Sequence, residues 1–203
     1  MIAGIFLAAG ESLRFERHKL LLEVGDRPLV YYSLKNCLDS LLPEVYVVLG
    51  ARSEELGGRI RRLFTDTEKI KIIINEDYRR GMMSSLKKGI SSLDTVYRGA
   101  MVLLADMPMV TPDIINRLMD VFEEKDKIII PQCLGELHHP RILPERVFPD
   151  FLLLDDDEKG TKVLENYSQE IIRVPIGNKK NFIDIDQLDD FESIAELLKN
   201  CAG

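Results

Sequence analysis

Short apolar runs alternate with longer amphipathic stretches along most of the chain, and this alternation most restricts the possible folds. Runs rich in Val and Ile predict strands at residues 2–8, 44–50, 69–75, 99–106 and 127–132. The stretches between them predict helices at residues 28–40, 53–64, 83–93 and 111–124. Strands this continuously apolar are typical of parallel sheets covered by helices on both faces. The sequence therefore predicts an α/β fold with three layers and a doubly wound, mostly parallel sheet.

The pattern becomes less regular after about residue 132. We expect a short strand within 138–144, short helices within 144–154 and 159–167, strands at 171–176 and 181–186, and a closing helix at 187–200. Linkers, repeats and low-complexity segments are absent from the sequence. The simplest interpretation is one domain over residues 1–203 with an irregular late insertion.

Charge and cysteine content narrow the class of protein. A net charge of -7 argues against binding nucleic acid, which requires a basic face. Cys37, Cys133 and Cys201 lack the spacing of a metal site, which favours idle thiols in a reducing compartment. The first apolar run has no basic leader and is too short to span a bilayer. We therefore expect a cytoplasmic protein that acts on small molecules, with no membrane partner.

The loop after the first predicted strand carries the clearest ligand signal. Ligands of open α/β sheets bind beyond the carboxyl ends of the strands. Ala8, Ala9 and Gly10 allow close backbone approach, and successive N–H groups there could bind phosphate oxygens. Arg14 and Lys19 add positive charge. The chain has neither G-x-G-x-x-G after this strand nor a P-loop motif, so the alternatives are another kind of phosphate loop or a charged surface turn.

The segment LAAGESLR followed by Lys19 resembles the nucleotidyltransferase signature L-A-A-G-x-S-x-R-M-G-x-x-K. Phe15 replaces Met and Glu16 replaces Gly, while Arg14 and Lys19 keep their spacing. Later segments agree in order: GMMSSL (81–86), ADMP (105–108), HP (139–140) and DID (184–186). This ordered set is similar to the family that includes molybdenum cofactor cytidylyltransferase and guanylyltransferase, whose fold is Rossmann-like.

The resemblance implies a set of site residues. Arg14, Lys19 and Asp106 would be catalytic, and Asp106 and Asp186 would hold Mg²⁺, with Asp184 as the alternative ligand to Asp186. His139 and Pro140 would contact the acceptor. The implied nucleotide-binding residues are Leu7, Ala8, Ala9, Gly10, Arg14, Lys19, Asn75, Gly81, Ser84 and Asp106.

The implied reaction is Mg²⁺-dependent transfer of a nucleoside monophosphate from CTP to the phosphate of molybdopterin, with release of pyrophosphate. The G-M-x-S-S-L and H-P segments favour CTP over GTP. A molybdoenzyme or a chaperone would be a compatible protein partner. Three alternatives stay open at this point: guanylyl transfer, another phosphorylated acceptor such as a sugar phosphate, and a non-catalytic nucleotide-binding module.

Overall fold

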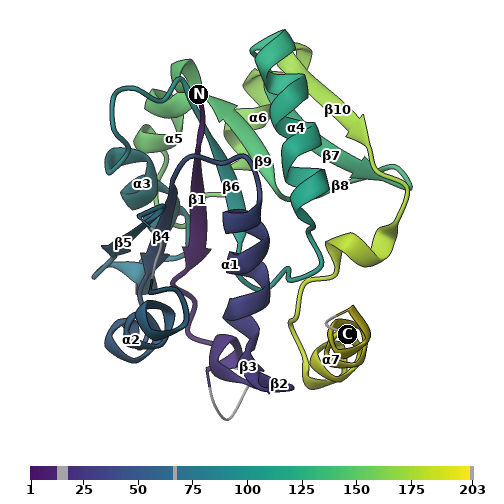
Figure 1. Ribbon diagram of the computed structural model, residues 1–203. Helices are drawn as coiled ribbons and strands as arrows, with labels where there is room; N and C mark the ends of the chain where they lie inside the picture. Colours follow the sequence, from purple (N-terminus) through teal and green to yellow (C-terminus); the bar gives the residue numbers. More distant parts are fainter. Residues whose placement is uncertain (13–17, 66–67, 202–203) are drawn as a thin grey trace.

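The computed structural model describes residues 1–12, 18–65 and 68–201, and its centre is one twisted sheet (Figure 1). The strand order is β10-β7-β9-β6-β1-β4-β5, with β8 paired to β7. The bounds are β1 (Ala3–Ala8), β4 (Val45–Leu49), β5 (Ile70–Ile74), β6 (Gly99–Leu104), β7 (Ile128–Cys133), β8 (Glu136–Leu137), β9 (Arg141–Pro144) and β10 (Ile171–Pro175). A separate ribbon pairs β2 (Glu23–Val24) with β3 (Arg27–Pro28).

Strand direction confirms a mostly parallel sheet. β1 pairs in parallel with both β4 and β6, β4 pairs in parallel with β5, and β10 pairs in parallel with β7. The exceptions are β8, which is antiparallel to β7, and β9, which lies antiparallel between β6 and β7. β9 comes from the irregular late part of the sequence, and it separates β1, β4, β5 and β6 from β7 and β10.

Helices cover both faces of the sheet, as the continuous apolar runs predicted. The α-helices are α1 (Leu29–Asp39), α2 (Ser53–Leu63), α3 (Met82–Ser91), α4 (Pro112–Lys125), α5 (Phe148–Leu153), α6 (Thr161–Asn166) and α7 (Leu188–Cys201). Apolar side chains of α1, α2, α4 and α7 share a buried cluster with one face of the sheet. Those of α3, α5 and α6 form a cluster on the other face. β1 supplies both, since Phe6 points into the first and Ile5 into the second.

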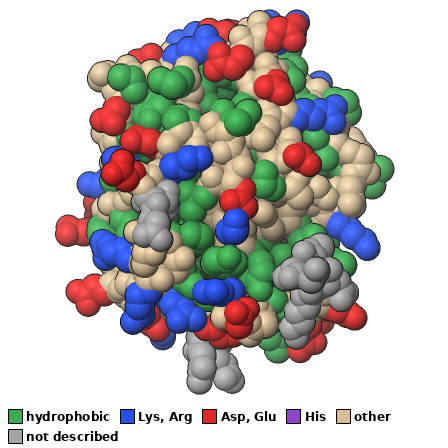
Figure 2. All heavy atoms as spheres, in the orientation of Figure 1, with side chains coloured by type: hydrophobic (Ala, Val, Ile, Leu, Met, Phe, Trp, Pro, Cys, Tyr) green, Lys and Arg blue, Asp and Glu red, His purple; other side chains and the backbone are tan. Residues whose placement is uncertain are grey.

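Helix boundaries follow the local sequence signals. The Thr111 hydroxyl accepts a hydrogen bond from the Ile114 N–H at 3.4 Å, so Thr111 is the N-cap of α4. Pro28 is the N-cap of α1 and directly precedes its first residue, Leu29. Figure 2 shows positively charged side chains at the lower left, over α2, whose own basic residues are Arg59, Arg61 and Arg62.

The predicted strand at 181–186 is wrong. Residues Lys179–Phe182 form a 3-10 turn, η5, in which the Asn178 side chain accepts from the Lys180 N–H. The following residues form no regular element. The Ile185 N–H instead donates to the Asp106 carbonyl at 3.1 Å, just beyond the end of β6. This segment therefore crosses the end of the sheet and joins no strand edge.

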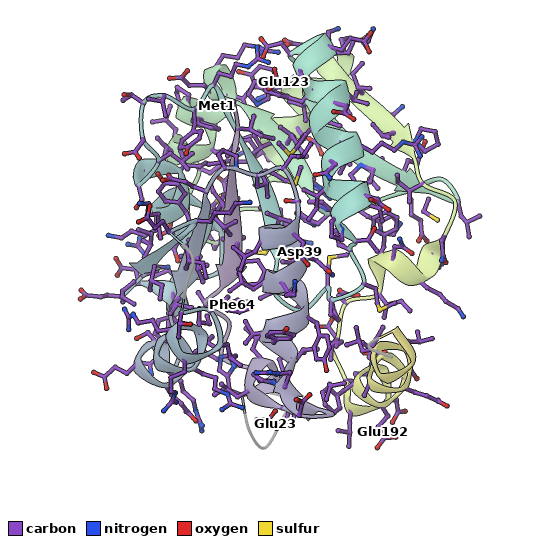
Figure 3. The ribbon with its side chains drawn as sticks, viewed as in Figure 1. Met1, Glu23, Asp39, Phe64, Glu123 and Glu192 are labelled. Atoms are coloured by element: carbon purple, nitrogen blue, oxygen red, sulfur yellow. The ribbon has the colours of Figure 1, made fainter. Side chains whose placement is uncertain are left out.

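The two ends of β1 have different surroundings. At the amino end, the Met1 ammonium lies 3.9 Å from the Glu123 carboxylate (Figure 3). At the carboxyl end, the chain meets the starts of α2 and α3 and the crossing segment around Ile185. Within the described residues, no helix combines the length and the apolar character needed to cross a bilayer.

Candidate active site

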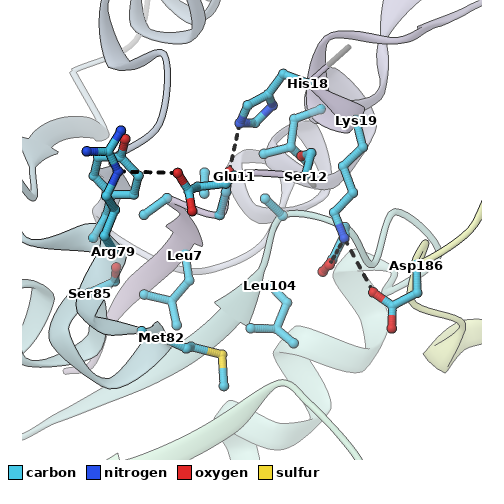
Figure 4. Close-up of a pocket in the computed structure, with 18 residues that line it drawn as sticks. Leu7, Glu11, Ser12, His18, Lys19, Arg79, Met82, Ser85, Leu104 and Asp186 are labelled. Carbon is cyan, nitrogen blue, oxygen red and sulfur yellow. Dashed lines mark hydrogen bonds and ion pairs between the residues drawn. The ribbon is translucent and has the colours of Figure 1, made fainter. Parts of the chain in front are cut away.

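A cavity of about 500 Å³, here called the first cavity, opens at the carboxyl ends of β1 and β6 (Figure 4). Its wall is built by the end of β1 and the loop that follows, by the start of α3, and by Asp106 and Asp186. Leu7, Met82 and Leu104 form its apolar side. The structure therefore places a ligand-sized space at the edge of the sheet where the sequence predicted one.

Backbone hydrogen bonds fix the position of the loop that follows β1. The Leu7 carbonyl accepts from the Ala105 N–H at 3.1 Å, and the Ala9 carbonyl accepts from the Ala51 N–H at 3.2 Å. Gly50 lies against the same turn, and a Cβ there would be only 2.7 Å from the Ala9 oxygen. The small residues from Ala8 to Gly10 are thus held in place while they line the cavity.

His18 ties the far end of this loop to its beginning. Its Nε2 lies 2.9 Å from the Gly10 carbonyl, and the side chain is buried. Burial lowers the pKa of His18, which favours a neutral ring that donates its Nε2–H to this carbonyl. The sequence analysis missed His18. The one sequence signal for His18 was its position, between a charged loop and the apolar residues that follow Lys19.

Lys19 joins the loop to the other end of the chain. Its Nζ donates to Asp106 Oδ2 at 2.6 Å and to the Ile185 carbonyl at 2.7 Å. Asp186 Oδ1 lies 3.7 Å from the same nitrogen (Figure 4). Lys19 and Asp106 are mostly buried, at 17% and 23% side-chain exposure, whereas Asp186 is half exposed at 54%. The structure therefore brings Asp106 and Asp186, two predicted residues from distant segments, next to the predicted Lys19.

The same oxygen atoms suit a divalent cation. Mg²⁺ prefers oxygen ligands and commonly uses one or two carboxylates together with water and substrate phosphates. Asp106, Asp186 and the Ile185 carbonyl already converge on a cation, the Lys19 ammonium. Among the described residues, no group of three or more His, Cys, Asp or Glu side chains could hold a metal. The donor set thus fits a metal that is shared with a bound phosphate, and the two carboxylates are those that the sequence analysis singled out.

The turn before α3 presents backbone and hydroxyl groups to the first cavity. Gly81, whose φ is 113°, lines the cavity together with Ser85. Asn75 and Ser84 do not line it, although both were predicted nucleotide-binding residues. Both are buried: Asn75 Nδ2 donates to the Ser84 and Ser85 hydroxyls at 3.0 Å, and the Ser84 hydroxyl lies 2.8 Å from the Gly81 carbonyl. They support the turn from behind.

The remaining predicted residues lie apart from the first cavity. His139 lines a second cavity on the α3 and α5 side of the sheet, while Pro140 is buried and lines neither of these two cavities. Arg14 lies outside the described residues, as do Phe15 and Glu16. Asp184 does not line the first cavity, whereas Asp186 does.

A sheet of this topology, with an anchored turn after β1 and paired carboxylates opposite it, defines the class of α/β nucleotidyltransferases. The particular family follows from comparison with known sequences. The chain belongs to the family of the MobA-like NTP transferase domain, whose model matches residues 4–171. It is therefore a nucleotidyltransferase.

Individual relatives agree with this assignment over nearly the whole chain. Molybdenum cofactor cytidylyltransferase of Escherichia coli (strain K12) is 27% identical over 195 residues, covering 95% of this chain and 94% of that protein. A probable molybdenum cofactor guanylyltransferase of Thermococcus kodakarensis is 24% identical and covers 96% and 94% of the two chains.

Solved structures show the same fold. The homolog of Mycobacterium tuberculosis rv0371c from Mycobacterium sp. strain JC1 has a TM-score of 0.85 at 24% identity and covers 98% of both chains. Rv0371C of Mycobacterium tuberculosis H37Rv, solved as a complex with manganese, has a TM-score of 0.79 at 21% identity and covers 96% and 98%.

Proposed function

We propose that this enzyme transfers a nucleoside monophosphate, CMP in preference to GMP, from the triphosphate to the phosphate of molybdopterin. The arrangement of Lys19 between Asp106 and Asp186, at the end of an anchored phosphate-binding turn, is the observation that carries the proposal. An acceptor phosphate oxygen attacks the α-phosphorus, the bond to the β-phosphate oxygen breaks, and pyrophosphate leaves. The nucleophile is already ionised, so the reaction needs no general base.

Binding of the triphosphate is assigned to the turn from Ala8 to Gly10. Backbone N–H groups in such a turn bind anionic oxygens without a counter-charge of their own. Arg14 keeps its proposed role at the β- and γ-phosphates on the basis of the family resemblance. The base and ribose are assigned to the wall made by Gly81 and Ser85, beside the turn. Asn75 and Ser84 act through the turn that they support.

Charge stabilisation is assigned to Lys19 and the two carboxylates. Mg²⁺ held by Asp106 and Asp186 would neutralise developing charge on phosphate oxygens. Lys19, held by Asp106 in this structure, would stabilise the charge that grows at the α-phosphate in the transition state. Support for a divalent metal comes from the oxygen donor set and from the manganese complex of the structural relative.

The preference for CTP rests on the G-M-x-S-S-L and H-P segments, which resemble the cytidylyl branch of the family. Among relatives matched over nearly their whole length, the Escherichia coli cytidylyltransferase is 27% identical, and the probable guanylyltransferases of Pyrococcus horikoshii and Thermococcus kodakarensis are 26% and 24% identical. Guanylyl transfer to the same acceptor is the second candidate.

The direct test is transfer from α-labelled CTP or GTP to molybdopterin in the presence of Mg²⁺. We expect a labelled dinucleotide product and pyrophosphate with CTP. Asp106→Asn should lower turnover by about 100-fold or more, because it removes charge at the reacting phosphates. Asp120→Asn is the matched control, since Asp120 is exposed on α4, away from the cavity. Equal rates for Asp106→Asn and the wild type, or no transfer from any triphosphate, would overturn the proposal.

A further inference from the structure

The second cavity, of about 580 Å³, adjoins the first on the α3 and α5 side of the sheet. The two cavities share four lining residues, Leu7, Arg79, Gly81 and Met82. A single molecule, or two reacting molecules, can therefore occupy both cavities side by side. Apart from these shared residues, His139 is the residue of the second cavity that the sequence analysis singled out.

The walls of the second cavity are apolar. Its floor is the sheet, through Val102 of β6 and Leu143 of β9. Its sides are Met83 of α3, Phe151 of α5 and Leu164 of α6, all buried in the cluster that covers this face. Such walls favour a ligand body with apolar faces over a hydrated sugar.

Arg141 is a charged residue on the sheet floor of this cavity, among the apolar side chains. It is the residue of β9 next to His139-Pro140, and it shares the face of Leu143, two residues further along the strand. Its Nε donates to the His138 carbonyl at 3.2 Å, and none of the described carboxylates pairs with its guanidinium. The side chain of Arg141 is half-buried, and this burial lowers the pKa of its guanidinium. A half-buried cation without a counter-ion is costly, and a bound anion would offset that cost.

The other charged groups around the cavity are already neutralised or lie at its rim. Asp156 accepts from Lys87 at 2.9 Å and pairs with Arg80 at 2.7 Å. Glu158 pairs with Lys162, and Arg79 lies 3.4 Å from Glu11. Asp157 and Lys159 are exposed at the rim. His139 beside Arg141 is neutral, because burial and the neighbouring guanidinium lower the pKa of His139 to about 3. Arg141 is therefore the lining group that needs a ligand charge.

We propose that the second cavity binds the body of the acceptor and that Arg141 binds a second anionic group on it, remote from the transferred phosphate. The acceptor class is then a phosphomonoester with a flat, largely apolar ring system and an additional negative charge. The inference rests on the proposed function for the transferred phosphate and deepens it by naming a specificity-determining residue. A guanidinium suits this task because it presents a rigid fork of donors to an oxyanion.

The test uses two fluorescent ring compounds without phosphate, so binding is separated from transfer. Pterin-6-carboxylate carries a flat ring and a negative charge, and 6-hydroxymethylpterin is its neutral counterpart. We expect Arg141→Met to weaken binding of the carboxylate about tenfold, since a charge-assisted hydrogen bond is lost. Binding of the neutral pterin should change less than about twofold, because it makes no such bond. Arg141→Lys should retain part of the preference, which also guards against a folding defect in the Met variant.

Arg146→Met is the matched control, because Arg146 is paired with Asp126 and Glu170 outside the cavity. Equal affinity of wild type and Arg141→Met for pterin-6-carboxylate, or no preference of the wild type for the acid, would overturn the inference. If that preference depends on Arg141 but no triphosphate is transferred, the proposed function fails and this binding site stands. If transfer to molybdopterin proceeds with an acceptor KM that is unchanged by Arg141→Met, the inference fails alone.

Discussion

At the scale of single residues, Lys19 has the most consequential position in the molecule. One ammonium group contacts Asp106, Asp186 and the carbonyl of Ile185, so it stands where a divalent cation would find the same oxygen atoms. On the proposed function, a metal at these oxygens would compete with Lys19, and its binding would be coupled to release of the lysine.

Replacing Lys19 separates its proposed role in turnover from its competition with a metal ion. Lys19→Met should lower turnover by about 100-fold or more, because a positive charge is lost beside the transferred phosphate. The same variant should bind Mg²⁺ more tightly in the absence of nucleotide, since the competing ammonium is gone. Turnover kinetics and the rise of Tm with Mg²⁺ alone measure the two effects. A variant with less response to Mg²⁺ than the wild type would contradict the shared site.

His139 should make stability depend on pH. Its pKa is about 3 in the folded protein, because of burial, and about 6.5 in an unfolded chain. Between these values the unfolded chain binds more protons, so the free energy of unfolding falls as the pH is lowered from 6.5 toward 3. His139→Gln should remove up to about 1.4 kcal/mol of this fall per pH unit. Urea unfolding at pH 5 to 7 measures it, and parallel profiles for the two proteins would show that His139 does not contribute.

At the scale of elements, α3 is held unusually close to β1, the strand that leads into the site. A Cβ on Gly89 would lie 2.5 Å from Cγ2 of Ile5, so the helix can approach the strand only with glycine at this position. The start of the same helix supplies Met82 and Ser85 to the first cavity. Close packing of α3 thus determines where the wall of the site lies.

Two glycine substitutions test this packing. Gly89→Ala should destabilise the protein by about 1–3 kcal/mol, as expected for overpacking in a core. Gly58→Ala, within α2, should stabilise it by about 0.5–1 kcal/mol, because a Cβ there meets nothing within 4 Å and alanine favours the helix. Chemical denaturation of both variants provides the comparison. The explanation by packing fails if both substitutions raise, or both lower, the free energy of unfolding.

Prediction from sequence succeeded for elements with strong local patterns. It failed where tertiary contacts determine whether a segment forms a strand. The Val- and Ile-rich runs gave β1, β4, β5, β6 and β7, and Thr111 marked the start of α4. The alternating pattern of 181–186 suggested a strand, but the apolar residues Phe182 and Ile185 are buried by a segment that crosses the sheet end. Local alternation reports burial of every second residue and does not reveal whether a neighbouring strand is available.

The same limit applies to the site. Motif positions placed Lys19, Asp106 and Asp186 together correctly, since each follows or crosses the end of a strand. They did not reveal that Asn75 and Ser84 lie behind the turn, because a hydroxyl or amide can serve a ligand or the backbone equally well. Arg141 was also missed, since only the packed structure shows that its charge has no carboxylate partner among the described residues.

At the scale of the whole molecule, the site joins the two ends of the chain. The loop after β1 supplies Lys19, and the segment before α7 supplies Ile185 and Asp186. α7 in turn packs against β2, close to the same loop (Figure 1). Nucleotide binding at this junction should therefore stabilise the entire fold and be visible as a shift of the global unfolding transition.

Thermal unfolding with CTP, GTP, ATP or UTP, each with and without Mg²⁺, is the most direct test of the central claim. A ligand at 100 times its Kd adds about 2.7 kcal/mol, or roughly 5–10 °C in Tm for a chain of this size. We predict a Mg²⁺-dependent shift with CTP that Asp106→Asn abolishes and Asp120→Asn preserves. A shift with GTP alone would favour the guanylyl candidate. No shift with any triphosphate at millimolar concentration, or an equal shift in Asp106→Asn, would contradict a nucleotide site built on Lys19, Asp106 and Asp186.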